Sequence, residues 1–252
     1  MARTFVTASA EYLRFPSCPI SDWPFTIGCW FYVPTDDGAN EWMLYLGDPD
    51  TSGHRCVLGD SLGLAGNPLR YIGRSGSANF SSSNSSTIGG WNSGLLAMHS
   101  TTSRDMWLNG VGTNNTATEI SVPSNWTRFS IGALDRDHTS KVYFDGAIAW
   151  ACVWDVGLSA GEAKAFSAGY HPYLIRPESL VLFAPLGGHD CADDQDIDHI
   201  TGTALSVGGT PTTTDHPSGL IYPSQQFIPF PSAAGLPIPV ASHHYTKNIG
   251  AA

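Results

Sequence analysis

Short runs of hydrophobic residues recur along much of the chain, and polar turn sequences separate them. The clearest run, residues 25–33, is rich in β-branched and aromatic residues and stops at the turn sequence 34–38. A second run at 41–47 ends at Asp48-Pro49-Asp50. Comparable runs follow at 55–58, 69–72, 94–99, 105–108, 128–131 and 179–186. Short strands at this spacing, joined by loops rich in Gly, Ser, Asn and Asp, predict an all-β antiparallel sandwich of two sheets.

A longer apolar run covers residues 141–154 and is interrupted at Asp145-Gly146, which predicts a bend or a bulge. One short helix is predicted soon after it. Ser159 is the expected N-cap of this helix, Glu162 is the reciprocal partner in a capping box, and Gly169 is the residue that ends it.

The pattern changes near the C-terminus. Residues 211–252 hold seven of the 17 prolines, and Lys247 is the one charged side chain after Asp215. Proline excludes a helix and interrupts central strands, whereas free disordered tails are usually polar and charged. We therefore expect a domain at residues 1–210 and an extended, Pro-rich arm at 211–252 that lies against a surface. The contact residues expected in this arm are Tyr222, Phe227, Ile228, Phe230 and Ile238.

Composition narrows the class of protein. Hydrophobic residues make up 42% of the chain, which excludes disorder of the whole chain. Charged residues make up only 13%, and the net charge is −10 without a cluster of Lys or Arg, so we expect no nucleic-acid partner. The longest apolar stretch, 146–154, is too short for a membrane helix. The first residues lack the apolar segment of a signal peptide, so we expect a soluble protein made in a cytoplasm.

The five cysteines form an odd set without a Cys-x-x-Cys spacing. This disfavours a zinc site and a full disulfide framework, and it predicts buried free thiols. The nine histidines form no site by spacing, and the pair His243-His244 is open to metal binding, packing or exposure.

Five pieces of the sequence stand in a characteristic order. They are the opening at 5–13, Phe-Thr-Ile-Gly-Cys-Trp-Phe at 25–31, Leu-Asn-Gly at 108–110, Arg-Phe-Ser-Ile-Gly-Ala at 128–133, and the stretch 143–163 with Phe-Asp-Gly-Ala-Ile-Ala and Leu-Ser-Ala-Gly-Glu. This series resembles the laminin-G-like domains of the concanavalin A-like fold, over residues 5–207. The resemblance implies an antiparallel jelly-roll sandwich of two sheets.

Later segments resemble the laminin-G-like structural proteins that tailed phages and prophages encode. The likeness is carried by 169–181, with His171-Pro172 inside it, by Pro-Leu-x-Gly at 185–188, and by His-Pro-x-x-x-Ile-Tyr-Pro-Ser at 216–224. This narrower resemblance implies a virion structural protein: a capsid decoration or minor capsid protein, or a tail or fibre component, assembled in the host cytoplasm. The implied partners are other virion proteins, further copies of the chain and cell-surface glycans.

The residues argue against catalysis. Glucanases of this fold carry a Glu-x-Asp-x-x-Glu strand whose carboxylates act as acid and nucleophile, and this chain has no such triplet. It also lacks the Gly-x-Ser-x-Gly, His-Glu-x-x-His and P-loop motifs. We therefore expect no enzyme. A carbohydrate-binding, lectin-like module is the alternative function, and a degenerate glycoside hydrolase is a third.

Two kinds of residue are candidates for binding a ligand. Trp91 and Trp126 stand in loop-like contexts, where an indole ring can stack on a sugar, and core packing is the alternative for each. Loop carboxylates are the ligands that calcium prefers, but Asp is also an ordinary turn residue, so calcium stays an open alternative and no cofactor is certain. The candidate calcium ligands are Asp48, Asp50, Asp135 and Asp137, with four further acids within 193–198.

Overall fold

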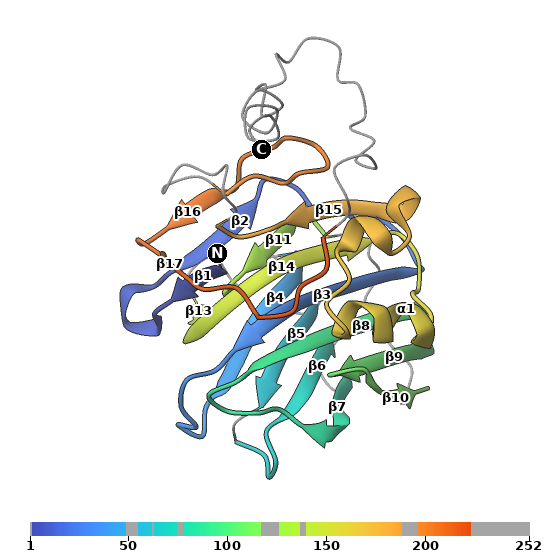
Figure 1. The fold of residues 1–252 in the computed structure, drawn as a ribbon, viewed down its shortest axis with the longest axis horizontal. Helices are drawn as coiled ribbons and strands as arrows, with labels where there is room; N and C mark the ends of the chain where they lie inside the picture. The colour runs from blue at the N-terminus through green and yellow to red at the C-terminus, as the bar shows by residue number, and fades with distance from the viewer. Residues whose placement is uncertain are drawn as a thin grey trace, which may run out of the picture. The chain divides into compact units, whose positions relative to one another are not determined.

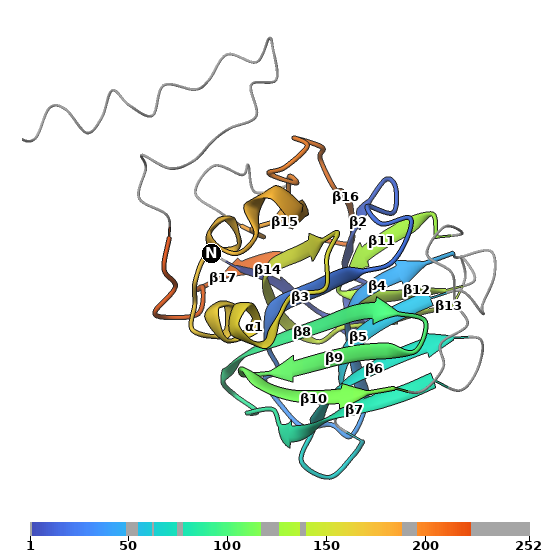
Figure 2. The same ribbon diagram turned by 90° about the vertical axis from the view of Figure 1, so that its right-hand side faces the viewer.

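The computed structural model describes residues 2–48, 55–61, 63–74, 78–116, 126–136, 140–187 and 196–222. In this part of the chain, two large antiparallel sheets pack face to face, and the short helix α1 (Ala160–Ser167) lies against the outer side of one of them (Figures 1 and 2). The jelly-roll-like sandwich predicted from the strand pattern and the resemblance is therefore confirmed.

Sheet A is the sheet that carries the helix. Its strands follow the order β10-β9-β8-β3-β14-β1-β17, and β15 also pairs with β14. Their bounds are β10 (Val111–Asn115), β9 (Ser103–Leu108), β8 (Trp91–Ser100), β3 (Phe25–Tyr32), β14 (Gly146–Trp154), β1 (Ala2–Phe5), β17 (Thr212–Thr214) and β15 (Leu180–Ala184).

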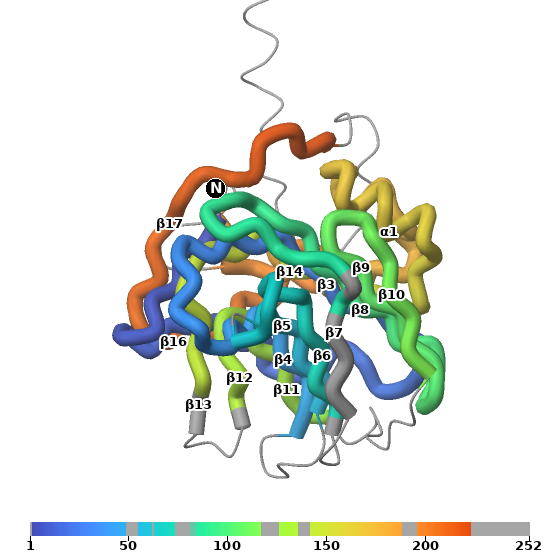
Figure 3. Tube along the Cα trace, turned by 90° about the horizontal axis from the view of Figure 1, so that it is seen from below, coloured from blue at the N-terminus to red at the C-terminus, as the bar shows by residue number. Residues whose placement is uncertain are grey.

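Sheet B forms the other layer, as the view from below shows (Figure 3). Its order is β16 (Ser206–Gly208), β2 (Tyr12–Phe15), β11 (Arg128–Ile131), β4 (Asn40–Gly47), β5 (Arg55–Ser61), β6 (Pro68–Arg74) and β7 (Ala78–Ser85). A separate hairpin of β12 (Ala133–Arg136) and β13 (Ser140–Tyr143) packs beside β4. The 3-10 turns are η1 (Thr7–Ser9), η3 (Pro172–Leu174) and η4 (Pro177–Ser179).

The main hydrophobic core lies between the two sheets. On β3, the alternate residues Phe25, Ile27, Cys29 and Phe31 are buried in it, because successive side chains of a strand point to opposite faces. Each large apolar side chain that is fully buried contributes about 1.5–3 kcal/mol. Because of the same alternation, Thr26, Gly28, Trp30 and Tyr32 face the outer side of sheet A.

The helix α1 covers one part of that outer face. Its N-cap Ser159 and Glu162 form the predicted capping box, in which the Ser159 amide donates to Glu162 Oε2 at 2.7 Å. Ala163 and Phe166 face inward and pack in a second hydrophobic cluster with Trp150 and other side chains of sheet A. The prediction of this helix from its caps is confirmed.

The apolar run 141–154 divides into two strands, β13 and β14, at the predicted interruption. Gly146 has a φ of +153°, and a Cβ there would lie 2.2 Å from the carbonyl oxygen of Tyr32. Only glycine allows the start of β14 to lie this close to β3, so Gly146 lets the chain pass from the hairpin into sheet A.

The first structural unit extends to Tyr222, beyond the boundary at 210 expected from composition. β17 pairs with β1, and Ile221 forms a parallel bridge with Tyr170. Of the contact residues predicted in the arm, only Tyr222 falls within the described structure. The others, Phe227, Ile228, Phe230 and Ile238, lie outside the described residues, as does the pair His243-His244.

Among the described cysteines, Cys18, Cys29 and Cys152 are unbridged, as predicted. Burial raises the pKa of the Cys18 thiol to about 12, and it also raises the pKa of Cys29 and Cys152. Cys191 lies outside the described residues. No helix in the described part of the chain is long and apolar enough to span a membrane.

Candidate functional site

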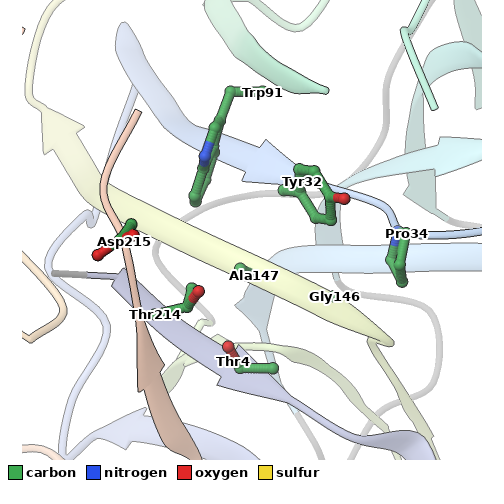
Figure 4. Close-up of a pocket in the computed structure, with 8 residues that line it drawn as sticks. All are labelled: Thr4, Tyr32, Pro34, Trp91, Gly146, Ala147, Thr214 and Asp215. Carbon is green, nitrogen blue, oxygen red and sulfur yellow. The ribbon is translucent and has the colours of Figure 1, made fainter. Parts of the chain in front are cut away.

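A pocket of about 300 Å³ lies on the outer side of sheet A, where strands β1, β3, β8, β14 and β17 come together. Figure 4 shows it with the side chains that line it. These residues are Thr4, Tyr32, Pro34, Trp91, Gly146, Ala147, Thr214 and Asp215.

The pairing register of sheet A brings these residues together from distant parts of the sequence. Trp91 pairs with Tyr32, Tyr32 with Ala147, and Ala147 with Thr4. Residues that are directly opposite in neighbouring antiparallel strands project on the same face, with Cβ atoms about 4.5–5.5 Å apart. The four side chains therefore form one row across the outer face. Thr214 joins them from the edge strand β17, which pairs with β1.

One end of the row is aromatic. The rings of Trp91 and Tyr32 lie with their centroids 5.9 Å apart and their planes at 54°. Both side chains are half-buried, so each ring keeps an exposed surface. Ala147 in the middle of the row is small and leaves space beside the two rings (Figure 4).

The other end of the pocket is polar. Thr4 and Thr214 supply hydroxyl groups, and Asp215 supplies a carboxylate (Figure 4). Thr214 and Asp215 are exposed, and Asp215 makes no hydrogen bond or ion pair with another residue of the described structure. An apolar ring surface opposite a few polar groups fits a small ligand that has one apolar face and a polar edge.

A buried acid, Glu41, is hydrogen-bonded to Asp145, the residue that precedes Gly146 of the pocket. The backbone amide of Asp145 donates to Glu41 Oε2 at 2.7 Å. Burial raises the pKa of Glu41 to about 7, and the negative charges of Asp37, Asp145 and Asp60 add to this effect. Burial also raises the pKa of Asp60 to about 7. Glu41 and Asp60 belong to sheet B, so of these acids only Asp145 is next in sequence to a lining residue, Gly146.

The two tryptophans proposed as sugar-binding residues have different environments. Trp91 lines the pocket. Trp126 is only 5% exposed and packs in the main core, where its ring meets Phe25 edge to face at 5.7 Å. The binding role expected for Trp126 is therefore corrected to core packing, because neither face of a buried indole is available to a sugar.

Asp135 is also corrected. It lies in strand β12, is fully buried, and accepts hydrogen bonds from Arg14 at 2.5 Å and Arg128 at 3.1 Å. Two guanidinium groups already compensate this carboxylate, so it is not a free loop ligand for calcium. Asp48 is half-buried at the end of β4, and the other two candidates, Asp50 and Asp137, lie outside the described residues. Among the described residues, no group of three or more His, Cys, Asp or Glu could hold a metal ion.

The described acids of the 193–198 cluster have structural roles. Asp196 pairs with Arg3 at 2.7 Å, and both side chains are buried. Asp198 accepts hydrogen bonds from the backbone amides of Phe183, Ile200 and Thr201. The carboxylate oxygens of Asp196 and Asp198 are therefore already engaged in contacts within the protein.

Sequence reasoning missed Thr4, Tyr32, Thr214 and Asp215 as members of a site. The outward position of Tyr32 is implied by the alternation along β3. The contribution of Thr4, Thr214 and Asp215 depends on the pairing of β1 with β14 and β17, for which the sequence carries no local signal.

Comparison with known proteins agrees with this architecture. Residues 7–164 match the Laminin_G_3 family, described as the Concanavalin A-like lectin/glucanases superfamily. Among curated proteins, none matches the chain.

Several solved structures share the fold at low sequence identity. A Bacteroides ovatus protein with a proposed carbohydrate-binding role superposes with a TM-score of 0.60 at 18% identity, over 86% of this chain and 60% of that protein. A heptameric SAP-like pentraxin from Limulus polyphemus gives a TM-score of 0.53 at 12% identity, over 79% of this chain and 89% of its own. The CBM40 module of the Ruminococcus gnavus IT-sialidase gives 0.51 at 14% identity, over 59% of this chain and 84% of the module. This chain thus spans about three fifths of the length of the Bacteroides protein.

Proposed function

Because the chain belongs to the concanavalin A-like lectin/glucanases superfamily, we propose that it is a carbohydrate-binding protein and that the pocket on the outer side of sheet A is its binding site. The observation that carries the proposal is the row of Trp91, Tyr32, Ala147 and Thr4 across four strands. It places two exposed aromatic surfaces next to hydroxyl groups and a carboxylate.

This arrangement suits a sugar ring. The C–H face of a pyranose is apolar and packs on an aromatic ring, while its hydroxyl groups lie at the edge and require hydrogen-bond partners. Trp91 and Tyr32 offer the first kind of surface. Thr4, Thr214 and Asp215 offer the second.

Two of the similar structures also support the proposal. The Bacteroides ovatus protein has a proposed carbohydrate-binding role, and the CBM40 of the Ruminococcus gnavus sialidase is a carbohydrate-binding module. At 18% and 14% identity, they support the class of ligand through the shared fold and not through shared site residues.

We propose binding without hydrolysis. Glycosidases that follow the common mechanism use a pair of carboxyl groups on either side of the scissile bond. The pocket lining contains one carboxylate, Asp215. The absence of the Glu-x-Asp-x-x-Glu triplet from the sequence supports the same conclusion.

The virion role expected from the phage-type resemblance stays a prediction, as do virion partners and self-association. It rests on the resemblance of 169–181, 185–188 and 216–224 to phage structural proteins. Four of the residues predicted to make assembly contacts, Phe227, Ile228, Phe230 and Ile238, lie outside the described structure. A sugar-binding pocket is compatible with a fibre that attaches to cell-surface glycans, so the proposal holds for a virion component or a free lectin.

A glycan array tests the proposal directly. We expect the purified protein to bind a defined set of glycans and Trp91→Ala to weaken that binding at least about tenfold, as is common for a central aromatic anchor. Tyr170→Ala is the matched control, because Tyr170 is an exposed aromatic residue outside the pocket lining. Circular dichroism checks that both variants fold. A blank array, or equal binding by Trp91→Ala and the wild type, would reject the proposal.

A further inference from the structure

The pocket lining carries negative charge without any positive charge. None of its eight residues is basic, and its one ionisable carboxylate, Asp215, is exposed. Asp215 has no partner among the described residues, so its oxygens are available to a ligand.

Further acids adjoin the opposite end. Asp145 immediately precedes Gly146, which lines the pocket, and Asp37 follows Pro34 in the loop that leaves it. The negative charges of Asp37 and Asp145 both contribute to the raised pKa of the buried Glu41. The segments that adjoin Pro34 and Gly146 in the sequence therefore also carry acidic residues.

The basic residue nearest in sequence does not offset this charge. Arg3 precedes Thr4 of the pocket, but its side chain is buried with 2% exposure. Its Nε donates to Asp196 Oδ2 at 2.7 Å, and its guanidinium also donates to the carbonyl oxygen of Pro211. The positive charge of Arg3 is thus paired with Asp196 inside the protein and does not face the pocket.

We infer that the pocket selects sugars by charge: it takes a pyranoside that bears a protonated amine and discriminates against sugars that bear a carboxylate. This inference rests on the proposed carbohydrate-binding function. The sugar ring stacks on Trp91, and its ammonium group pairs with Asp215. The two aromatic rings add a favourable interaction with the cation, while a uronate or a sialic acid meets like charge without a basic partner in the lining.

Three tetrasaccharide probes separate the possibilities by isothermal titration calorimetry at pH 6. They are a β-1,4-linked glucosamine tetramer with free amines, its N-acetylated counterpart, and a galacturonic acid tetramer. We expect the glucosamine tetramer to bind roughly three- to tenfold more tightly than the N-acetylated one, the size of a partly exposed ion pair, and the uronate to bind most weakly. Added salt should reduce the preference for the amine, because it screens exposed charges.

Asp215→Asn isolates the charge at nearly constant shape. We expect this variant to bind the free-amine and N-acetylated tetramers with nearly equal affinity, because it lacks the charge that distinguishes them. An unchanged ratio in Asp215→Asn, or uronate binding as tight as amine binding, would overturn the inference. If the N-acetylated tetramer still binds and loses affinity in Trp91→Ala, the proposed function stands and only the charge selection fails. If none of the probes binds and the glycan array is also blank, both the proposed function and the charge selection are overturned.

Discussion

Glu41 of β4 and Asp60 of β5 lie directly opposite each other in sheet B, and both side chains are buried. Asp60 accepts hydrogen bonds from the Ser61 amide at 2.9 Å and from the Ser86 hydroxyl at 2.6 Å, and Glu41 accepts one from the Asp145 amide. None of these donors is a cation. Burial therefore dominates, and the pKa of each carboxyl group rises to about 7.

This pair makes stability depend on pH in a definite direction. Because the pKa values of both acids are higher in the folded protein than in the unfolded chain, their contribution to the free energy of unfolding is greatest below about pH 4 and is lost as the pH rises to about 7. The side chain of Glu41→Gln stays neutral at every pH. The free energy of unfolding of this variant should therefore fall less over this interval than that of the wild type, and the difference should be about 1–3 kcal/mol. Urea denaturation at pH 4.5 and pH 8 measures the difference. The exposed Glu178→Gln should behave as the wild type, and equal pH profiles for the wild type and Glu41→Gln would contradict the prediction.

The two tryptophans Trp91 and Trp126 should separate binding from folding. Trp126→Ala removes a 5% exposed ring from the core and should lower the free energy of unfolding by about 3–5 kcal/mol. Trp91→Ala removes a half-buried ring from the pocket, so its effect on stability should be smaller, about 1 kcal/mol, while sugar binding is weakened at least about tenfold. Chemical denaturation of both variants compares them, and a larger loss of stability for Trp91→Ala would refute the assignment.

These tryptophans also show that local sequence does not predict which of two similar residues is buried. Gly-Trp-Asn at 90–92 and Asn-Trp-Thr at 125–127 look alike, since both place an indole among polar residues. Their difference arises from tertiary packing, because the chain before β11 turns Trp126 toward Phe25. Local signals, by contrast, were sufficient for the apolar strands, such as those at 25–32 and 40–47, and for the capping box of Ser159 and Glu162, whose interactions span only a few residues.

The same limit applies to the carboxylates. Asp135 stands in an Asp-Arg-Asp sequence that is typical of a turn, yet it lies in β12 and pairs with Arg14 and Arg128 from other strands. Asp215 had no motif around it, and it reaches the pocket because β17 pairs with β1. Strand order and register, which decide such long-range contacts, follow from the packing of the whole sandwich.

The ion pair of Arg3 and Asp196 ties the first strand to a segment near the end of the described structure. Both side chains are at most 2% exposed, and the Arg3 Nε lies 2.7 Å from Asp196 Oδ2. Arg3→Met leaves Asp196 buried without its cation and should cost about 3–5 kcal/mol. The double variant Arg3→Met/Asp196→Asn removes the uncompensated charge and should recover part of this loss. Thermal unfolding of the single and double variants measures the coupling, and strictly additive losses would argue against it.

The segment from His216 to Tyr222 should stabilise the sandwich by covering Trp150. Trp150 sits at an irregularity of β14 with a φ of +52° and is fully buried. The Tyr222 ring meets its indole edge to face at 5.5 Å. The backbone of Ile221 is fixed as well, since its amide donates to the Gly169 carbonyl at 2.6 Å and its carbonyl accepts from the His171 amide at 2.8 Å.

Two shortened chains test this role, one ending at Tyr222 and one ending at Asp215. The shorter chain exposes the Trp150 indole and loses both backbone hydrogen bonds of Ile221, so it should be less stable by about 2–4 kcal/mol. It should also show a red-shifted tryptophan emission, because the indole gains contact with water. In the full chain, Ile221→Pro removes one donor and should reproduce part of the loss, whereas Ser218→Pro, at an exposed position, should have a smaller effect. Equal unfolding free energies for the two shortened chains would show that residues 216–222 rest on the sandwich without stabilising it.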